Sequence, residues 1–364
     1  MLVARKSDLL GVLKQVVTFI PRAKTSDSSS IVHLLPDPVG ARLALHFPEA
    51  SIEVLCPLKD GETFTEPMSF LGPRFLAIVA RCSDEITITK DETKAVIVSG
   101  KSKWVEPLLA TKNLRMLGRS DNPLTFNLFF LTSSIAKVRY ALDTDSARPA
   151  LYMVDIENGR VRACNGFQYH EVESDIAGLT CSLPGTLLDN FVKTLRALGS
   201  DELQFWCDQD QFYFATDTST IALRRLEVTF PDLDRLLVRP LKSESPALLQ
   251  VDRDELLAAA QRVQLATDDD YPYVEVHLTK SEVLLRCTQK LGAEAISSVK
   301  ALWDTKPRVA TFNVHHFVKS IEALDRGTVE IRFGQDSKTS RSPLTVEGVG
   351  QWSMLNQTML STRV

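Results

Sequence analysis

The sequence predicts an α+β protein built from three similar domains, each with two helices packed on antiparallel sheets. Three observations lead to this prediction. A short strand followed by a helix recurs six times along the chain. Alternating apolar segments separate the copies, and two polar, proline-containing stretches divide the chain into near-equal thirds. Repeats of this kind decide the fold class before any single motif does.

Each copy of the repeat begins with an apolar strand and passes within a few residues into a helix that carries an apolar pair one turn apart. The copies start roughly 60 residues apart, which is too long for a small solenoid repeat. They read LVARKSDLLGVLKQV, MSFLGPRFLAIVARC, LFFLTSSIAKVRYAL, CSLPGTLLDNFVKTL, LLQVDRDELLAAAQRV and ATFNVHHFVKSIEAL. The expected core pairs are Leu9 with Val12, Phe75 with Ile78, Ile135 with Val138, Leu188 with Phe191, Leu256 with Ala259, and Phe317 with Ile321.

The segments between these helices read as antiparallel strands. DEITITKDETKAVIVSG and DELQFWCDQDQFYFATD alternate apolar and polar residues, as hairpins do. LYMVDIENGRVRAC contains an Asn158-Gly159 pair, which is a strong signal for a tight hairpin turn. Each repeat is therefore expected to hold one helix followed by about four antiparallel strands.

Two linkers are predicted where the chain becomes polar and contains proline, at Ser120–Pro123 and at Ser243–Pro246. They divide the six repeats into pairs. The expected domains are residues 1–122, 123–245 and 246–364.

The composition is that of an ordinary soluble protein, with 44% hydrophobic and 24% charged residues among 364 and a net charge of −4. No apolar run approaches the ~18 residues that span a bilayer, and the N-terminus lacks the apolar core of a signal peptide. A cytoplasmic location is expected. The six cysteines are scattered without a CxxC pair, which favours reduced thiols over disulfides or zinc. No metal or cofactor is predicted.

An enzyme is disfavoured, because the chain contains no Walker loop and no GxSxG, HExxH or GxGxxG motif. The run Asp268-Asp269-Asp270 has the donors for Mg²⁺ binding, as in a nuclease. It follows a helix end and has no second acidic cluster at a clear spacing, so a solvated loop is the preferred interpretation. No catalytic residue is predicted.

Several segments are similar to one family. RPALYMVDIENGRVRACNGFQYHEVE resembles the strands that open the family's second domain, and VDRDELLAAAQRVQLATDD resembles the helix that starts the third. FPDLDRLL, at residues 230–237, matches the family's Phe-Pro-Asp segment, and the chain stops at MLSTRV, at the family's length. Over essentially its whole length the chain resembles the beta subunit of bacterial DNA polymerase III, the replicative sliding clamp, as a divergent member.

The resemblance implies a head-to-tail homodimer in which two chains close into a ring around double-stranded DNA, with helices lining the hole and sheets outside. Such a ring binds DNA without regard to sequence. It tethers the polymerase and is loaded by a clamp loader, both of which dock through short peptide motifs. The alternative is an interaction scaffold that keeps the fold without binding DNA, and the acidic total leaves it open.

A clamp is expected to attract phosphates through weak, replaceable contacts from its helices. Five of the six helix regions lean basic although the whole chain is acidic. The competing interpretation is that each of these cations is merely solvated. The predicted DNA-contacting residues are Arg22 and Lys24 in a loop, Arg74, Arg81, Lys137, Arg139, Lys193, Arg196 and Lys319.

The resemblance also implies a pocket for partner peptides between the second and third domains. Its positions carry over to Leu151, Cys164, Gly166, Phe167, Gln168, Tyr169, Pro231, Arg235, Leu236, Leu344, Leu360, Thr362, Arg363 and Val364. The competing interpretation for Leu151, Phe167 and Tyr169 is ordinary strand core. The run CNGFQY and the tail MLSTRV, which lacks the family's proline, depart from the family pattern. The pocket is therefore expected to prefer a different peptide, as a phage, plasmid, second-copy or divergent host clamp would.

Overall fold

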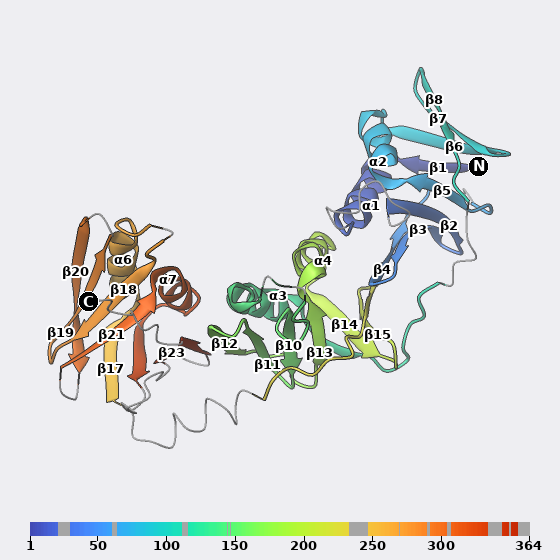
Figure 1. The fold of residues 1–364 in the computed structure, drawn as a ribbon. Helices are drawn as coiled ribbons and strands as arrows, with labels where there is room; N and C mark the ends of the chain where they lie inside the picture. Colours follow the sequence, from blue (N-terminus) through green and yellow to red (C-terminus); the bar gives the residue numbers. More distant parts are fainter. Residues whose placement is uncertain are drawn as a thin grey trace. The chain divides into compact units, whose positions relative to one another are not determined.

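In the computed structural model, six strands each lead directly into a helix (Figure 1). In chain order the pairs are β1 (Leu2–Arg5) with α1 (Lys6–Thr18), β5 (Met68–Leu71) with α2 (Gly72–Arg81), β9 (Leu124–Asn127) with α3 (Leu128–Val138), β13 (Thr180–Pro184) with α4 (Gly185–Ala197), β17 (Ala247–Asp252) with α6 (Arg253–Gln264), and β21 (Arg308–Asn313) with α7 (Val314–Glu322). A 3₁₀ turn, η3 (Arg139–Ala141), continues α3.

Three strands follow each helix. They are β2 (Ile31–Asp37), β3 (Gly40–Phe47) and β4 (Ala50–Cys56); β6 (Glu85–Asp91), β7 (Lys94–Ser99) and β8 (Ser102–Pro107); β10 (Met153–Glu157), β11 (Arg160–Cys164) and β12 (Gln168–Glu173); β14 (Glu202–Cys207), β15 (Gln211–Ala215) and β16 (Ser219–Arg224); β18 (Tyr273–Leu278), β19 (Glu282–Thr288) and β20 (Glu294–Trp303); β22 (Thr328–Phe333), β23 (Leu344–Gly348) and β24 (Gln351–Leu355). The predicted strand–helix repeat is confirmed, but three strands follow each helix, and the fourth strand of each repeat is the one before its helix.

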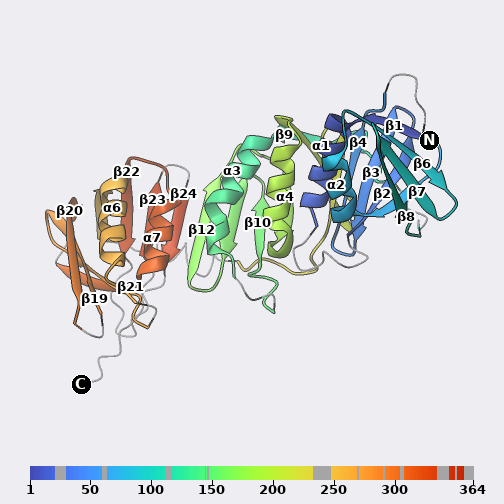
Figure 2. The same ribbon diagram turned by 90° about the horizontal axis from the view of Figure 1, so that it is seen from above.

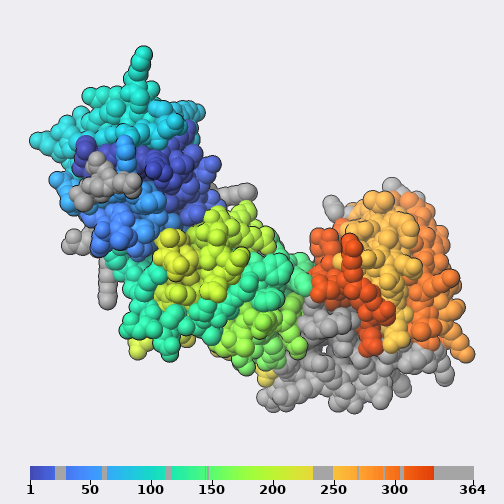
Figure 3. Space-filling view, turned by 180° about the vertical axis from the view of Figure 1, so that it is seen from behind, coloured from blue at the N-terminus to red at the C-terminus, as the bar shows by residue number. Residues whose placement is uncertain are grey.

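The structure describes residues 1–20, 30–59, 64–110, 116–143, 145, 147–232, 247–268, 270–289, 292–303, 307–333, 344–348 and 351–355. These are the coloured parts of Figure 3 where they face the viewer. In this described part no helix is long and apolar enough to cross a membrane.

All six predicted helical pairs are buried, which explains why each repeat folds as it does. Leu9, Ile135 and Leu256 are at most 1% exposed, and their partners one turn away are also buried. Aromatic contacts join strands to helices within the core, as in the stacking of Phe70 on Phe75 with ring centroids 4.2 Å apart. The one-turn spacing of the apolar pairs thus arises because each helix buries one face against a sheet.

Side-chain caps start three of the helices at the same point of the repeat. Asn127 Oδ1 accepts a hydrogen bond from the backbone N–H of Phe129 at 2.8 Å. Asp252 and Asn313 cap α6 and α7 in the same way. A cap of this kind satisfies a backbone donor that the helix itself leaves unpaired. The acidic start of α6 therefore has a structural role.

The predicted hairpins are confirmed. At the β10–β11 turn, Asn158 and Gly159 adopt φ values of 47° and 88°, the left-handed conformation that an Asn-Gly hairpin turn requires. The β6–β7 and β14–β15 hairpins form where the alternating segments predicted them.

Contacts divide the chain into two compact units, residues 1–132 with 181–227 (unit 1) and residues 133–180 with 228–364 (unit 2). In unit 1, α1 packs against α2 and α4 (Figure 2), and the sheets run β1-β6-β7-β8 and β5-β2-β3-β4-β16-β15-β14-β9. In unit 2, α6 packs against α7 and the sheet continues as β10-β11-β12-β24-β23-β22-β17-β20-β19-β18-β21. The domain boundaries after residues 122 and 245 stay a prediction.

The two units contain the same arrangement of strands. The order β2-β3-β4-β16-β15-β14-β9 in unit 1 corresponds strand by strand to β10-β11-β12-β24-β23-β22-β17 in unit 2. In each case the third strand after one helix pairs with the third strand after a later helix, β4 with β16 and β12 with β24. The internal repeat therefore extends to sheet topology.

Candidate functional site

The predicted DNA-contacting arginines of α2 both lie on its exposed surface. Arg74 Nε lies 2.6 Å from a carboxylate oxygen of Glu106 on β8, so part of its charge is already neutralised. Arg81, at the end of the helix, donates a hydrogen bond to the backbone oxygen of Ala77 at 3.0 Å. No acidic residue lies on α2 itself. The exposed surface of α2 is therefore basic, with Arg81 as its less compensated cation.

The cations of the other helices differ in how far acids compensate them. Lys137 Nζ is 2.8 Å from Asp325, and Lys319 Nζ is 2.7 Å from Glu322. Among the side chains that the structure describes, the exposed pair Lys193 and Arg196 on α4 has no ion-pair partner. Arg139, in η3, is also exposed. The two cations of α4 are therefore available for phosphates.

Helix charge opposes the charge of the whole chain. The described helices and η3 together carry more Lys and Arg than Asp and Glu, whereas the chain has a net charge of −4. The strands and loops therefore hold the acidic excess. Such segregation, rather than net charge, is what a phosphate-binding surface needs. The loop residues Arg22 and Lys24 lie outside the described residues.

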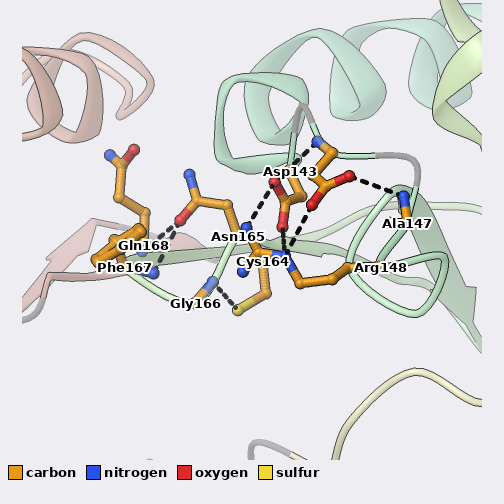
Figure 4. A network of polar contacts seen from close by, with 9 residues as sticks. Asp143, Ala147, Arg148, Cys164, Asn165, Gly166, Phe167 and Gln168 are labelled. Carbon is orange, nitrogen blue, oxygen red and sulfur yellow. Dashed lines mark hydrogen bonds and ion pairs between the residues drawn. The ribbon is translucent and has the colours of Figure 1, made fainter.

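The loop between β11 and β12 forms the exposed part of the predicted partner pocket. Asn165 Oδ1 accepts hydrogen bonds from the backbone N–H groups of Phe167 at 2.9 Å and Gln168 at 2.8 Å, which closes the turn (Figure 4). Gly166 has a φ of 87°, where a side chain would be strained. The turn holds Phe167 with 64% of its surface exposed. An aromatic ring held outward at this cost is a feature of binding surfaces.

The neighbours of this loop are buried and satisfied. Cys164 and Tyr169, which pair across the hairpin, are 5% and 1% exposed. Tyr169 donates a hydrogen bond to Glu171 at 2.7 Å, and burial raises the pKa of the Cys164 thiol. Both residues therefore support the loop from beneath, and within the loop Gly166 and Phe167 are the exposed residues.

A second network lies beside the loop in Figure 4. Asp143 is buried, and its carboxylate oxygen lies 3.0 Å from Arg148 Nε. The backbone N–H of Asp143 donates to the carbonyl oxygen of the half-buried Leu151 at 3.2 Å. The charge of Asp143 makes a small contribution to the raised pKa of the Cys164 thiol. Leu151 is thus anchored next to the loop, where its side chain remains partly accessible.

The Phe-Pro-Asp segment is brought to the same place. The ring of Phe230 lies 6.5 Å from that of Tyr169, and the guanidinium carbon of Arg162 lies 5.3 Å above the Phe230 ring. Pro231 follows and is half-buried. The structure therefore joins two parts of the predicted pocket that are far apart in sequence. Arg235, Leu236, Leu360, Thr362, Arg363 and Val364 lie outside the described residues, as does the side chain of Leu344, whose backbone begins β23.

A buried polar network holds the loop strand against α7. Gln168 Nε2 donates to the carbonyl oxygen of His316 at 3.1 Å and to Ser320 Oγ at 3.3 Å. Tyr140 Oη lies 3.0 Å from His170 Nδ1 and donates to Ser320 at 3.4 Å. These partners were not predictable from the sequence, because the contacts join residues between 30 and 180 positions apart.

Burial keeps His170 uncharged. Desolvation, with a smaller contribution from Lys137, lowers the pKa of His170 to about 3, and burial beside His46 lowers the pKa of His33 to about 4. Both imidazoles are therefore neutral in the folded protein at pH 5.5, whereas they become protonated on unfolding, with an ordinary pKa near ~6.5.

We expect acid to destabilise the protein through these two histidines. Above pH ~6.5 neither histidine makes stability depend on pH. Below pH ~6.5 each histidine binds a proton in the unfolded state but not in the folded state. Stability therefore falls with pH until the pKa of the histidine in the folded state is reached. At pH 5.5 each of the two histidines lowers the free energy of unfolding by about 1.4 kcal/mol. Urea unfolding midpoints at pH 7.5 and 5.5 measure the loss. The His170→Gln variant should be less stable than the wild type at pH 7.5, but it should lose less stability between pH 7.5 and pH 5.5. An unchanged loss of stability would contradict the role assigned to His170.

The order of elements defines the fold that is compared. Along the described chain it consists of six repeats of strand, helix and three strands. Comparison with solved structures specifies it further, while no family model matches the chain and no curated protein matches it.

Bacterial sliding clamps are among the solved structures that match. The DNA polymerase III subunit beta of Pseudomonas aeruginosa is 16% identical, with a TM-score of 0.85 and coverage of 98% of this chain and 99% of that one. The pol III beta of Caulobacter crescentus is 17% identical, with a TM-score of 0.86 over 99% and 100%. The sliding clamp of Bartonella birtlesii, bound to griselimycin, is 16% identical, with a TM-score of 0.84 over 99% of both chains. The chain has the three-domain fold of the DNA polymerase III beta subunit.

Proposed function

We propose that this protein is a DNA sliding clamp, a non-catalytic ring that encircles duplex DNA and tethers a polymerase for processive synthesis in the cytoplasm. The observation that carries the proposal is the segregation of charge within a clamp fold. Basic residues gather on the helices of a chain whose net charge is −4. Attraction to phosphates from many weak contacts holds DNA without fixing its position, which is what sliding requires.

Ring closure is supported by the edges of two strands, β8 and β20, which are not paired in the way that the corresponding strands of the other repeats are. The third strands β4 and β12 pair with β16 and β24, whereas β8 pairs with β7 alone among the described strands. β20 pairs with β19 along Glu294–Lys300 and with β17 only at its last three residues. In the other repeats, the third strand after a helix pairs with the third strand of the repeat three places later. By the same pairing, β8 of one chain is the partner for β20 of another.

Both leftover edges carry exposed apolar side chains that a closed ring would cover. Val105 on β8 is 51% exposed, and Ile296 on β20 is 56% exposed. The β7–β8 hairpin stands out from the rest of unit 1 (Figures 1 and 3). Open edges with apolar side chains template pairing with another chain. Two such contacts in a head-to-tail arrangement close a homodimer, in which the edges of β8 and β20 are covered.

The partner site is proposed to be the surface around the β11–β12 loop. Its exposed anchor is Phe167, its adjoining residues are Leu151, Gly166 and Pro231, and its support is Cys164 and Tyr169. A single exposed aromatic ring on a rigid turn is suited to the apolar anchors of a short peptide. Polymerase and clamp loader are the proposed partners.

We expect Phe167→Asp to abolish polymerase stimulation while leaving ring and DNA binding intact. The ring of Phe167 is exposed, so its replacement changes recognition rather than folding. The measurement is the length of products made on a primed circular template by the polymerase and loader of the source organism. Val39→Asp, at an equally exposed apolar residue of the β2–β3 turn, is the control. Equal loss in both variants would argue against a partner site at Phe167.

The same extension reaction tests the function as a whole. The wild-type chain should convert short products into long ones, and only when the loader is present. Failure to lengthen products with any loader, despite a folded dimer, would favour a clamp-fold scaffold that has lost its role in synthesis.

A further inference from the structure

Unit 1 contains a cavity of about 630 Å³ that neither the DNA surface nor the partner site uses. It lies between the β3–β4 hairpin, the chain segment at residues 116–120 and the β14–β15 hairpin. Its lining includes His46 and Ser51 from the first hairpin, and Trp206 and Tyr213 from the second. The volume falls within the ~300–1,000 Å³ of sites that hold small ligands.

The cavity occupies, within unit 1, the place that the partner site occupies within unit 2. His46 pairs with Ser51 one position inside the turn of β3–β4, as Cys164 pairs with Tyr169 one position inside the turn of β11–β12. Ser51 pairs onward with Ala222 on β16, and Tyr169 with Met354 on β24. The registers therefore place two cavity residues at the positions of two partner-site residues.

A buried carboxylate occurs at the same position in both. Glu53 on β4 and Glu171 on β12 lie two residues beyond Ser51 and Tyr169, and they are 1% and 5% exposed. Glu53 accepts a hydrogen bond from the backbone N–H of Leu117 at 2.9 Å, which fixes the segment that closes the cavity. Burial raises the pKa of the Glu53 carboxyl. The cavity is thus a built feature with its own support.

The chemistry of the cavity differs from that of the partner site. Trp206 and Tyr213 face each other across the hairpin with ring planes 5° apart and centroids 5.2 Å apart. Both rings are half-buried on the outer face of the sheet, opposite the buried Phe205, Phe212 and Phe214. A stacked aromatic pair on an outward face is a platform for a flat side chain, and for a cation above all.

Acidic groups stand beside this platform. Asp208 Oδ2 accepts a hydrogen bond from Tyr213 at 2.8 Å, and the Asp208 Oδ1 atom accepts from two backbone N–H groups of the turn, which lowers the pKa of Asp208. Asp210 lies exposed in the same turn. Met116 and Leu117 supply apolar contact on the opposite side. The cation Arg119 donates to the carbonyl oxygens of Thr216 and Asp217, at 2.6 and 2.8 Å.

We propose that this cavity is a second peptide-docking site, which takes an arginine flanked by aliphatic residues. The guanidinium lies on the Trp206–Tyr213 platform and pairs with Asp210, and an aliphatic neighbour contacts Met116 and Leu117. Arginine suits this place because its planar group both stacks on aromatic rings and pairs with carboxylates. The proposal takes the proposed partner site as its template, but its ligand is selected by residues of unit 1 alone.

The test uses the intact protein labelled with 5-fluorotryptophan, whose four tryptophans give four fluorine resonances. The Trp206→Phe variant assigns the resonance of Trp206. The probe is acetyl-Leu-Arg-Leu-amide, and the matched probe is acetyl-Leu-Gln-Leu-amide, which lacks the charge. We expect a saturable shift of the Trp206 resonance at millimolar concentrations of the arginine probe, and at least tenfold weaker binding of the glutamine probe.

Two variants and one control test the proposal. Asp210→Lys should weaken binding of the arginine probe at least tenfold, whereas the control Asp91→Lys, at the exposed last residue of β6, should not. Gly118→Phe, at a residue with open space around it, should fill the cavity and abolish the shift. Equal binding of both probes, or an Asp210→Lys variant that binds as before, would overturn the proposal. Neither result depends on DNA or polymerase. The cavity proposal can therefore fail while the proposed clamp function is upheld, and the reverse is also true.

Discussion

Reversing the charges of Arg81, Lys193 and Arg196 to glutamate is expected to weaken DNA binding by tenfold or more. Among the described side chains, no acidic group forms an ion pair with these three predicted DNA-contacting cations. Each phosphate contact removed should also lower the slope of log affinity against log salt by ~0.9, so that the variant becomes both weaker and less salt-sensitive. Fluorescence anisotropy with a short labelled duplex, over a series of salt concentrations, measures both quantities.

The matched control is a triple variant with the same change in net charge. Lys94, Arg224 and Lys280 are exposed cations on strands and loops. Their reversal to glutamate should reduce affinity only slightly, through the weak and screened long-range field. Equal losses in the two triple variants would show that net charge, and not the helix surface, governs binding.

The second large effect is expected at the strand edges. The double variant Val105→Asp with Ile296→Asp should have a mass near 40.6 kDa by light scattering, whereas the wild type should have twice that mass. New carboxylates on two edges that pair with each other repel one another and lose water on association. Both side chains are exposed, so the monomer itself should fold.

Its control places the same two charges at exposed apolar residues away from both edges. Val39 is 73% exposed in a turn, and Leu265 is 87% exposed at the end of α6. The variant Val39→Asp with Leu265→Asp should remain a dimer. A dimer in both double variants would mean that β8 and β20 do not form the interface, and that the repeat rule fails at ring closure.

The repeat was predictable from the sequence because its signal is local. Leu9 and Val12 mark a buried helix face through spacing alone, and Asn158-Gly159 marks a hairpin through the backbone angles that this pair tolerates. The side chain of Asp252 accepts a hydrogen bond from the backbone N–H three residues later, so the cap of α6 is also a local feature.

Contacts between distant residues were not predictable. The basic surface of α2 was read from Arg74 and Arg81, but the ion pair of Arg74 with Glu106 depends on sheet pairing. In the same way Tyr169 was assigned to a peptide pocket, and its burial against Phe230 appeared only in three dimensions. The cavity at Trp206 gave no sequence signal, because its walls come from three segments far apart in the chain.

Whether the protein forms a closed ring around DNA is tested most directly by comparing its retention on circular and on linear DNA. The protein is loaded onto a nicked circular plasmid, free protein is removed by gel filtration at moderate salt, and half of the sample is linearised. A sliding ring should remain with the circle and leave the linear molecule through its ends. Equal retention on both forms, or none on either, would contradict the account.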